Sequence, residues 1–538
     1  MERNMHLQDA RPRLFLVLHK ILGALFGLFF GLMLLFSLTA AGERTLWMLL
    51  FLGLSVPALW LLGGAAKLPA PSLSQPVRWA LLGFGGVLLL AAQARFAIAI
   101  YGRVDYDFSY VYYAAQGLFL DGDLAGQEGY FAQFPNNLLL TFLFAFVMKC
   151  AAFVGVTNFM AVLTACSMAA VDLSIALACL CAKKLWGLRA AWLTLGFGVP
   201  LCVLHYGIAC PYSDTFGMVF PVLFLFLRLY GPRRGWAGAA VMASMGLLAA
   251  AGYKIKPQTI LILPALALVE LCCIKPDRPR LLMLGRRLLC FGLGLAIGFA
   301  GVNTLARALT REVITEQMLE ERETPFTHYL MMGCNPETGG FFSTEDYEAT
   351  LAQKTQPEKR AFNLQVTARR LGEMGPAGYL EFLIQKGRKI FQSAYMDMWV
   401  RGPFSRDDGL SVFLQETLCQ GGSRFPVYQQ LLQALWVILL GLWVLPVALC
   451  PKGYEDWAGA VLRLEVMGFG LFQLLFEGGA RYRFHQTPVF ILLGVWGMGE
   501  LAERWREIRE ARKEPKPEAG PDRGPGGASR SAQQDSES

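Results

Sequence analysis

Long apolar runs separated by shorter polar stretches recur along most of this chain. A run of about 20 apolar residues is long enough to cross a bilayer as a helix. We expect spans at residues 21–41, 46–66, 77–100, 138–156, 159–182, 190–204, 215–229, 236–251, 259–274, 288–309, 428–449, 457–476 and 488–501. The span at 457–476 is the weakest, because Arg463 and Glu465 lie inside it. The pattern predicts an all-α polytopic membrane protein with about 12–13 transmembrane segments.

Composition narrows the class of protein further. Of the 538 residues, 54% are hydrophobic and 17% are charged, and the mean hydropathy is +0.40. These values are typical of multi-spanning membrane proteins and exclude an ordinary soluble enzyme. The net charge of +8 does not indicate nucleic acid, because the basic residues gather at span ends. The 12 cysteines show no metal-ligand spacing. A disulfide between Cys334 and Cys419 can be considered, but the cysteine spacing shows no disulfide framework that would support it.

The positions of Lys and Arg predict the orientation of the loops. Basic clusters lie at residues 3–20, 67–78, 183–189, 228–234, 275–287, 452–463 and 504–516. If all of them face the cytoplasm, the number of crossings agrees only when 138–156 is a re-entrant or interfacial element. The alternative is that one span elsewhere is wrongly bounded. The last cluster opens a tail that turns rich in Pro, Gly, Ser and charge, which predicts disorder on the cytoplasmic side.

This orientation divides the chain into five parts and places the polar loops together. The parts are an N-terminal two-span extension (1–77), a membrane core (78–309) with its first external loop at 101–137, an external stretch with amphipathic helices (310–425), the C-terminal spans (426–503) and the disordered cytoplasmic tail (504–538). The loops expected on the external face are 101–137, 205–215, 253–258, 310–425 and 477–488. Their convergence on one surface is the main inference from the pattern.

The first external loop carries two acids directly after a predicted span. A carboxylate at the mouth of a span is costly to place and is therefore a functional candidate. In an extended stretch, Asp105 and Asp107 would point the same way. Apolar residues then recur at helical spacing, at Phe108, Val111, Tyr112 and Ala115, which predicts a short helix at the membrane surface with Asp107 as its N-cap.

Basic residues in the other external loops are suited to bind a lipid-linked phosphate. Lys256 follows one predicted span, and Arg481 and Arg483 flank Tyr482 before the last one. Arg95 lies in the outer third of the span at 77–100. The arginines could equally extend to lipid headgroups, and Asp214 could equally cap the helix that follows it.

Other chemistries find no support in the sequence. There is no G-x-S-x-G motif and no Walker or dinucleotide-binding fingerprint. His205 and His485 have no partners at zinc-ligand spacing. Asp172, inside an apolar run, is expected to pair with a neighbouring helix. The sequence identifies no cofactor with certainty, and a divalent metal at the acids is an open alternative.

The external motifs resemble those of the GT-C superfamily of polytopic glycosyltransferases, which includes the protein O-mannosyltransferases, the aminoarabinose transferases and bacterial family 39-like members. The motifs are VDYDFSYVYYAAQGLFLDGD (104–123), YFAQFPNN (130–137), PYSDT (211–215) and GARYRFHQTP (479–488). The resemblance covers roughly residues 78–500. The chain departs from the pattern in having Asp-Tyr-Asp instead of adjacent acids, and a single Pro135 where relatives have two.

The resemblance implies an inverting sugar transfer from a polyprenyl-phosphate donor to an extracytoplasmic acceptor, which is a glycan, a lipid or a protein. Asp107 would be the general base, with Asp105 as second choice. The implied donor-phosphate ligands are Arg481, Tyr482, Lys256 and Arg95, and the implied substrate contacts are Tyr130, Pro135, Asn136, Asp214 and Arg483. A bacterial plasma membrane is the compatible location. The alternatives are a transporter or flippase of lipid-linked glycans and a non-catalytic assembly protein.

Overall fold

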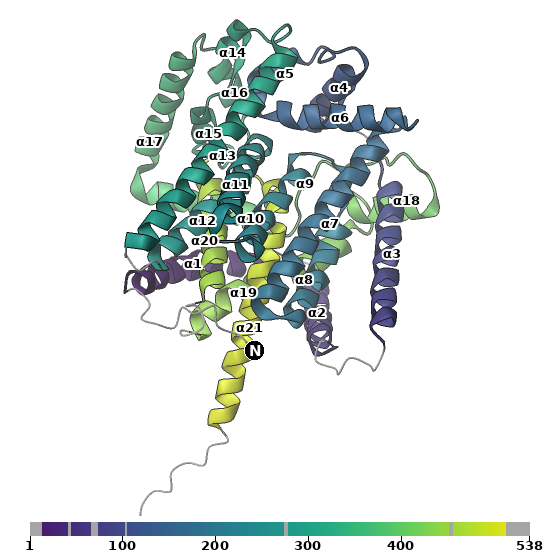
Figure 1. The fold of residues 1–538 in the computed structure, drawn as a ribbon, viewed down its shortest axis with the longest axis vertical. Coiled ribbons are helices and arrows are strands. Elements are labelled where there is room, and N and C mark those ends of the chain that lie inside the picture. Colours follow the sequence, from purple (N-terminus) through teal and green to yellow (C-terminus); the bar gives the residue numbers. More distant parts are fainter. Residues whose placement is uncertain are drawn as a thin grey trace, which may run out of the picture.

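The computed structural model describes residues 13–40, 45–65, 74–102, 105–273, 278–450 and 456–512. Within these ranges the chain is almost entirely helical, and Gly102 and Phe404 form an isolated antiparallel β-bridge. The residues of the tail beyond 512 lie outside the described part of the chain. The prediction of an all-α polytopic protein is confirmed (Figure 1).

The helices fall into three groups along the chain. The first group is α1 (Arg13–Thr39), α2 (Thr45–Ala65), α3 (Gln75–Ala99), α4 (Tyr106–Leu120), α5 (Glu128–Gln133), α6 (Leu138–Phe153), α7 (Phe159–Trp186), α8 (Leu188–Gly198), α9 (Ser213–Gly217), α10 (Val219–Tyr230), α11 (Gly235–Ile255), α12 (Ile262–Cys273) and α13 (Arg278–Thr310). The second is α14 (Glu316–Arg322), α15 (Phe326–Gly333), α16 (Thr344–Leu351), α17 (Gln356–Phe391) and α18 (Gly409–Leu418). The third is α19 (Phe425–Leu449), α20 (Trp457–Leu475) and α21 (Thr487–Ala511).

Short tight turns connect several of these helices. They are the 3₁₀ helices η2 (Pro135–Asn137), η4 (Tyr206–Ala209), η5 (Pro257–Ile260) and η7 (Ala480–Gln486), and the π-helical turn η3 (Val199–Val203).

Nine helices of the described residues are long and apolar enough to cross a membrane. They are Lys20–Thr39, Gln75–Ala99, Pro135–Phe153, Phe159–Trp186, Ser213–Tyr230, Gly235–Ile255, Leu281–Thr310, Phe425–Leu449 and Trp457–Leu475. Shorter apolar helices cover Leu46–Ala58, Leu188–Val203 and Pro257–Cys273. Each coincides with a run predicted as a span. The span predicted at 488–501 is the buried first half of α21, whose second half is charged and exposed.

The membrane helices pack by two different means. Around α19, α20 and α21 the core is filled by large side chains, including Trp443 and Trp496, which are almost fully buried. Between α11 and α13 the backbones themselves touch. A Cβ at Gly246 would lie 2.1 Å from the carbonyl oxygen of Phe291, and one at Gly294 would lie 2.0 Å from that of Ala243. Small residues permit such close helix approach in membranes.

A second, separate apolar core holds residues 105–137 in place. Phe108, Val111 and Ala115 of α4 are buried against α6, which confirms the predicted helix and its apolar face. In Figure 1, α6 lies beside α4 at one end of the molecule and runs across the direction of α3 and α7. Although α6 is long enough to cross a membrane, this placement favours the interfacial element that the orientation argument required.

In Figure 1, α14–α17 lie near α5 at the same end of the bundle, whereas α18 lies beside α3. Arg370 binds Asp346 through two hydrogen bonds of 2.9 and 2.7 Å, and the fully buried Lys359 donates to backbone carbonyls at the end of α14. The amphipathic run predicted at 361–392 is helical, within α17, with a kink at Gly375, where φ is +61°. This end of the molecule is therefore a folded layer.

Two smaller expectations have clear outcomes. Asp172 accepts a 3.0 Å hydrogen bond from Gln93 of α3, which confirms that it pairs with a neighbouring helix. Cys334 and Cys419 are both free thiols, so the disulfide considered between them does not exist.

Candidate functional site

The two acids of the first loop are separated by a left-handed residue. Asp105 is extended (φ −130°, ψ 165°) and occupies the N-cap position of α4 without a side-chain capping bond. Tyr106 has a φ of +54°, and Asp107 lies in the first turn of the helix. The expectation of an extended Asp-Tyr-Asp stretch is therefore wrong, and so is the expectation that Asp107 is the N-cap. A tyrosine at positive φ is a strained conformation, of a kind that clusters at functional sites.

Asp107 is held by a chain of hydrogen bonds that starts at the next motif. The Tyr130 hydroxyl donates to Asp107 and accepts a 2.7 Å hydrogen bond from the Asn137 amide. The Tyr212 hydroxyl donates to Asn137 Oδ1 at 3.4 Å. Burial raises the pKa of Asp107 above the ordinary carboxyl value, while Arg481 and the Tyr130 hydrogen bond act in the opposite direction. A carboxylate with a raised pKa is a stronger base than an ordinary one.

Three charged residues from three loops form what we call the ion cluster: Asp214, Lys256 and Arg481. Asp214 is fully buried, and its carboxylate lies 2.7 Å from Lys256 Nζ and 3.3 Å from Arg481. Asp214 lies in the first turn of α9, and the capping position belongs to Tyr212. These three residues together carry a formal charge of +1, and two further acids whose pKa values burial raises, Asp107 and Glu477, adjoin Arg481.

Burial and neighbouring charges act differently on the two cations of the ion cluster. Burial lowers the pKa of Lys256, and Asp214 opposes that shift only in part. Burial also works against the charged form of Arg481, but Asp214, two tyrosines and Asp107 outweigh it, so the pKa of Arg481 lies above its ordinary value. The arginine therefore keeps its charge under all conditions in which the protein is folded.

Aromatic rings enclose both cations. The guanidinium of Arg481 lies 3.4 Å from the ring centre of Trp399, and Lys256 Nζ lies 4.5 Å from that of Tyr482. Trp399 also stacks on Tyr106, with 5.3 Å between ring centres. Like Tyr106, Trp399 has a positive φ, of +60°. Two strained aromatic residues thus pack against each other beside the ion cluster, and cation–π contacts hold the arginine in place.

Glu477 is a site residue that the sequence reasoning missed. It accepts a 3.2 Å hydrogen bond from the Tyr482 hydroxyl, and burial raises its pKa while Arg481 acts to lower it. Lys386 fixes the backbone just before it by donating to the carbonyls of Leu474 and Phe476. Trp399 and Asn137 were missed as well. Asn137 stood inside the quoted motif YFAQFPNN, and Glu477 lies two residues before GARYRFHQTP.

The structure brings together part of the predicted set. Asp107, Tyr130, Asp214, Lys256, Arg481 and Tyr482 interact with one another as described above. Pro135 begins η2, and Asn136 donates to Asn137 Oδ1 at 3.2 Å, so both adjoin the hydrogen-bond chain to Asp107.

Two predicted ligands have other partners. Arg95, on α3, is about half exposed and pairs with Asp408 at 3.1 Å. Arg483 is fully buried and donates to the carbonyls of Ser393 and Tyr395 at 2.7 and 3.1 Å. Its guanidinium also lies 4.9 Å from the ring centre of Trp436. These contacts give Arg483 a role in holding the segment after α17.

The histidines and acids do not form a metal centre in the described part of the chain. No group of three or more His, Cys, Asp or Glu residues there is arranged to hold an ion. His205 stacks between Tyr206 and Phe484, and burial lowers its pKa to about 3. It is therefore a neutral packing residue.

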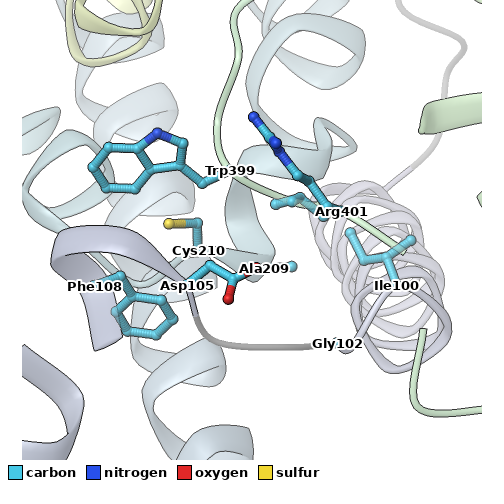
Figure 2. Close-up of a pocket in the computed structure, with 9 residues that line it drawn as sticks. Ile100, Gly102, Asp105, Phe108, Ala209, Cys210, Trp399 and Arg401 are labelled. Carbon is cyan, nitrogen blue, oxygen red and sulfur yellow. The ribbon is translucent and has the colours of Figure 1, made fainter. Parts of the chain in front are cut away.

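A pocket opens beside the ion cluster. It is lined by Ile100, Gly102, Asp105, Phe108, Ala209, Cys210, Trp399, Val400 and Arg401 (Figure 2). In Figure 2, Trp399, Cys210 and Phe108 lie on one side, Arg401 and Ile100 on the other, and Asp105 between them. Trp399 contacts both this pocket and Arg481. The two acids of the first loop therefore serve adjacent spaces: Asp105 lines the pocket, and Asp107 faces the ion cluster.

A family model described as "Conserved hypothetical integral membrane protein" matches residues 14–500. The chain belongs to this family. No curated protein and no solved structure matches the chain at a significant level. Membership of an integral membrane family agrees with the apolar helices and establishes a multi-pass membrane protein. In this integral membrane protein, a buried acid, two buried cations and an aromatic-lined pocket meet at one end of the helix bundle.

Proposed function

We propose that this protein is a membrane glycosyltransferase that moves a sugar from a polyprenyl-phosphate donor to an acceptor on the extracytoplasmic side of a plasma membrane. The observation that carries the proposal is the adjacency of Asp107 to the ion cluster. Arg481, Asp214 and Lys256 all act electrostatically on the Asp107 carboxyl group. A base next to a cationic site is what transfer from a phosphate leaving group requires.

The donor phosphate is assigned to the ion cluster and Tyr482. The donor carries one negative charge as a phosphodiester and leaves as a monoester with a second charge. Lys256 and Arg481 would stabilise the charge that develops on the leaving oxygen, which is the step where fixed cations contribute most. Asp214 is fully buried between them and would position the cations without touching the sugar.

The transfer itself needs one base. Asp107 takes the proton of an acceptor hydroxyl, and the acceptor oxygen attacks the anomeric carbon as the bond from that carbon to the phosphate oxygen breaks. The sugar configuration inverts, polyprenyl phosphate leaves, and the proton remains on Asp107. The raised pKa of Asp107 suits this role, because a stronger base accepts the proton more readily. The strained turn at Tyr106 aims Asp107 at the cations and Asp105 elsewhere.

The test is the release of polyprenyl phosphate from labelled polyprenyl-phosphate hexoses by the purified full-length protein in proteoliposomes. Asp107→Asn should abolish release. Asp121→Asn, an exposed acid of the same loop, should not change it. Release that survives Asp107→Asn would rule out Asp107 as the base. Movement of intact donor across the bilayer without cleavage would support the transporter or flippase reading instead.

A further inference from the structure

The membrane-spanning helix α20 carries a fully buried acid, Glu465, that the proposed reaction does not use. Glu465 is the ninth of the 19 residues of this helix and so lies near its midpoint. Neither of its carboxyl oxygens has a hydrogen-bond partner of good geometry. An acidic group at this depth of a membrane is costly to place and usually has a function.

The charged and titratable groups of the described helices around α20 leave Glu465 without a counter-charge. Arg463, two residues earlier on α20, points to another side of the helix and lies 4.5 Å from the ring centre of Trp496. The others have partners or positions elsewhere: Glu270 of α12 binds Arg228, Lys386 of α17 binds the carbonyls of Leu474 and Phe476, His328 of α15 lies 2.8 Å from Thr350, and Glu500 and Glu503 belong to the charged half of α21. An ionised carboxylate at Glu465 would therefore be buried without compensation, at high cost, whereas the protonated acid is neutral.

The turn η7 folds back along α20 and brings two polar side chains to this depth. The Gln486 side chain acts on the Glu465 carboxyl group through a hydrogen bond of poor geometry, although Glu465 lies ten residues, or about 15 Å of helix, before the end of α20. Gln486 Nε2 also donates to the carbonyl of Gln258 at 3.2 Å and lies 3.3 Å from His485 Nε2. Gln486 and His485 are both fully buried, so this contact is shielded from water.

His485 extends the connection from Glu465 to the ion cluster. It interacts electrostatically with Asp214 and Lys256. Burial lowers the pKa of His485 well below the ordinary value, so its ring is neutral, with one nitrogen that donates and one that accepts. Such a ring can take up a proton at one nitrogen and release one from the other. Polar groups therefore connect the middle of α20 with the ion cluster.

We propose that Glu465 is a proton-binding site inside the membrane and that Gln486 and His485 connect it to the ion cluster. The ligand is a proton, which the carboxylate binds to give a neutral acid and which needs no cavity. The proton comes from water at the ion-cluster end of the molecule and returns by the same route. Series of acids and histidines carry protons in this way in membrane proteins. The inference goes beyond sugar transfer, in which Glu465 takes no part.

Infrared spectroscopy of the full-length protein in proteoliposomes tests the bound proton directly. At neutral pH, the spectrum of wild type minus that of Glu465→Gln should contain the C=O stretch of a protonated carboxylic acid. Glu465→Met provides the same comparison without a polar group, and thermal unfolding in detergent checks that each variant is folded. Glu270→Gln is the matched control, because that acid of α12 is paired with Arg228; its difference spectrum should contain carboxylate bands only. Carboxylate bands for Glu465 at neutral pH would overturn the proposal.

Exchange in D₂O tests the route of the proton. The acid band of the wild type shifts as deuterium replaces the bound proton. His485→Phe should slow this shift by about tenfold or more, because exchange then depends on local opening of the helices. His205→Phe is the matched control, since His205 is also buried and stacks between Tyr206 and Phe484. Its exchange rate should equal that of the wild type.

Two results would overturn the route through His485. Equal rates in all three proteins would show that His485 does not carry the proton, and equal slowing in both variants would show a general effect of packing. The proton site and sugar transfer are tested separately, because these spectra need no sugar donor. A protein that binds the proton but cleaves no polyprenyl-phosphate sugar would refute the transfer chemistry and retain the proton site.

Discussion

Arg481 and Arg483 are separated only by Tyr482, yet they belong to two different regions of the molecule. Arg481 faces Asp214 and Trp399, and its carboxylate neighbours keep its pKa above the ordinary value in spite of burial. Arg483 faces backbone carbonyls, and burial lowers its pKa to about 9. Buried cations in this protein are therefore of two kinds, one held by acids and one held by the backbone.

The buried lysines Lys256 and Lys386 also fall into these two kinds, acid-held and backbone-held. Lys256 lies 2.7 Å from Asp214. Lys386 donates to the carbonyls of Gly333, Leu474 and Phe476 at 2.8, 3.0 and 2.6 Å, close to the ends of α15 and α20. Carbonyls at helix C-termini have no partner within the helix and attract cations. The backbone-held cations, Lys386 and Arg483, donate their hydrogen bonds to carbonyls and so connect segments of the fold. The ion cluster instead has two cations and one acid, Asp214.

The largest effect is expected at Asp107, the acid beside the ion cluster. Asp107→Asn should lower sugar transfer by about 10²–10⁴-fold, the usual contribution of a general base. Protein level in membranes should stay normal, because the amide can still accept from Tyr130. Asp105→Asn is the internal comparison and should have less effect on kcat, because Asp105 does not face the ion cluster. The assay is transfer of labelled sugar at saturating donor. Equal kcat losses in both variants would mean that the turn at Tyr106 does not divide their roles.

The next effect contrasts the two arginines directly. Arg481→Gln should reduce transfer by about 10²–10³-fold, since it removes a charge that stabilises the leaving group. Its thermal stability should change little, because Lys256 still neutralises Asp214. Arg483→Gln should behave in the reverse manner, with lower thermal stability and near-normal kcat in the protein that remains folded. Thermal unfolding in detergent and initial rates on the same samples give both quantities. Similar profiles for the two variants would remove the distinction between acid-held and backbone-held cations.

Some of the features behind these predictions could be predicted from the sequence, and others could not. Apolar runs predict the helices well because lipid forces the backbone to satisfy its own hydrogen bonds. The expected convergence of the polar loops on one face also predicted that four site residues lie close together. They are Asp107, Asp214, Lys256 and Arg481. Hydropathy and residue spacing could predict these features because both are properties of residues that are close in sequence.

Other features depend on backbone conformation and long-range contacts that no local pattern encodes. The left-handed Tyr106 is what separates Asp105 from Asp107. The sequence reasoning grouped Arg481 and Arg483 because they flank Tyr482 in one loop. They lie instead in η7, where three residues make a turn, and therefore point to different sides. Trp399, in an irregular segment after α17, reaches Arg481 only through the folded chain.

A smaller effect is expected for Lys386, which tests the backbone-held cations alone. Lys386→Met should lower the free energy of unfolding by roughly 3 kcal/mol, because buried carbonyls lose a charged donor. Lys389→Met is the matched control, since that exposed lysine donates to the single carbonyl of Thr338 at 2.9 Å; its loss should be well under half as large. Chemical denaturation monitored by tryptophan fluorescence measures both. Transfer per folded molecule should be unchanged, and a selective loss of kcat would place Lys386 in the site itself.

The smallest effect concerns pH. Burial raises the pKa of Asp107 above the ordinary carboxyl value of 3.8. Activity should therefore rise with pH as the carboxyl group loses its proton, with a midpoint above 3.8. The folded protein holds this proton more tightly than the unfolded chain. Its contribution to stability is therefore complete below the ordinary carboxyl pKa and is lost as pH rises through the raised value. In Asp107→Asn that part of the stability profile should be absent. A wild-type midpoint at or below 3.8 would contradict the burial argument.

The position of Arg481 near the end of the chain has a consequence for biogenesis. While the earlier helices insert, the nascent protein contains Asp214 and Lys256 as a neutral pair. The second cation of the ion cluster, Arg481, is added only with the final loop, between α20 and α21. The proposed phosphate-binding site would therefore be complete only when the last part of the membrane fold has formed.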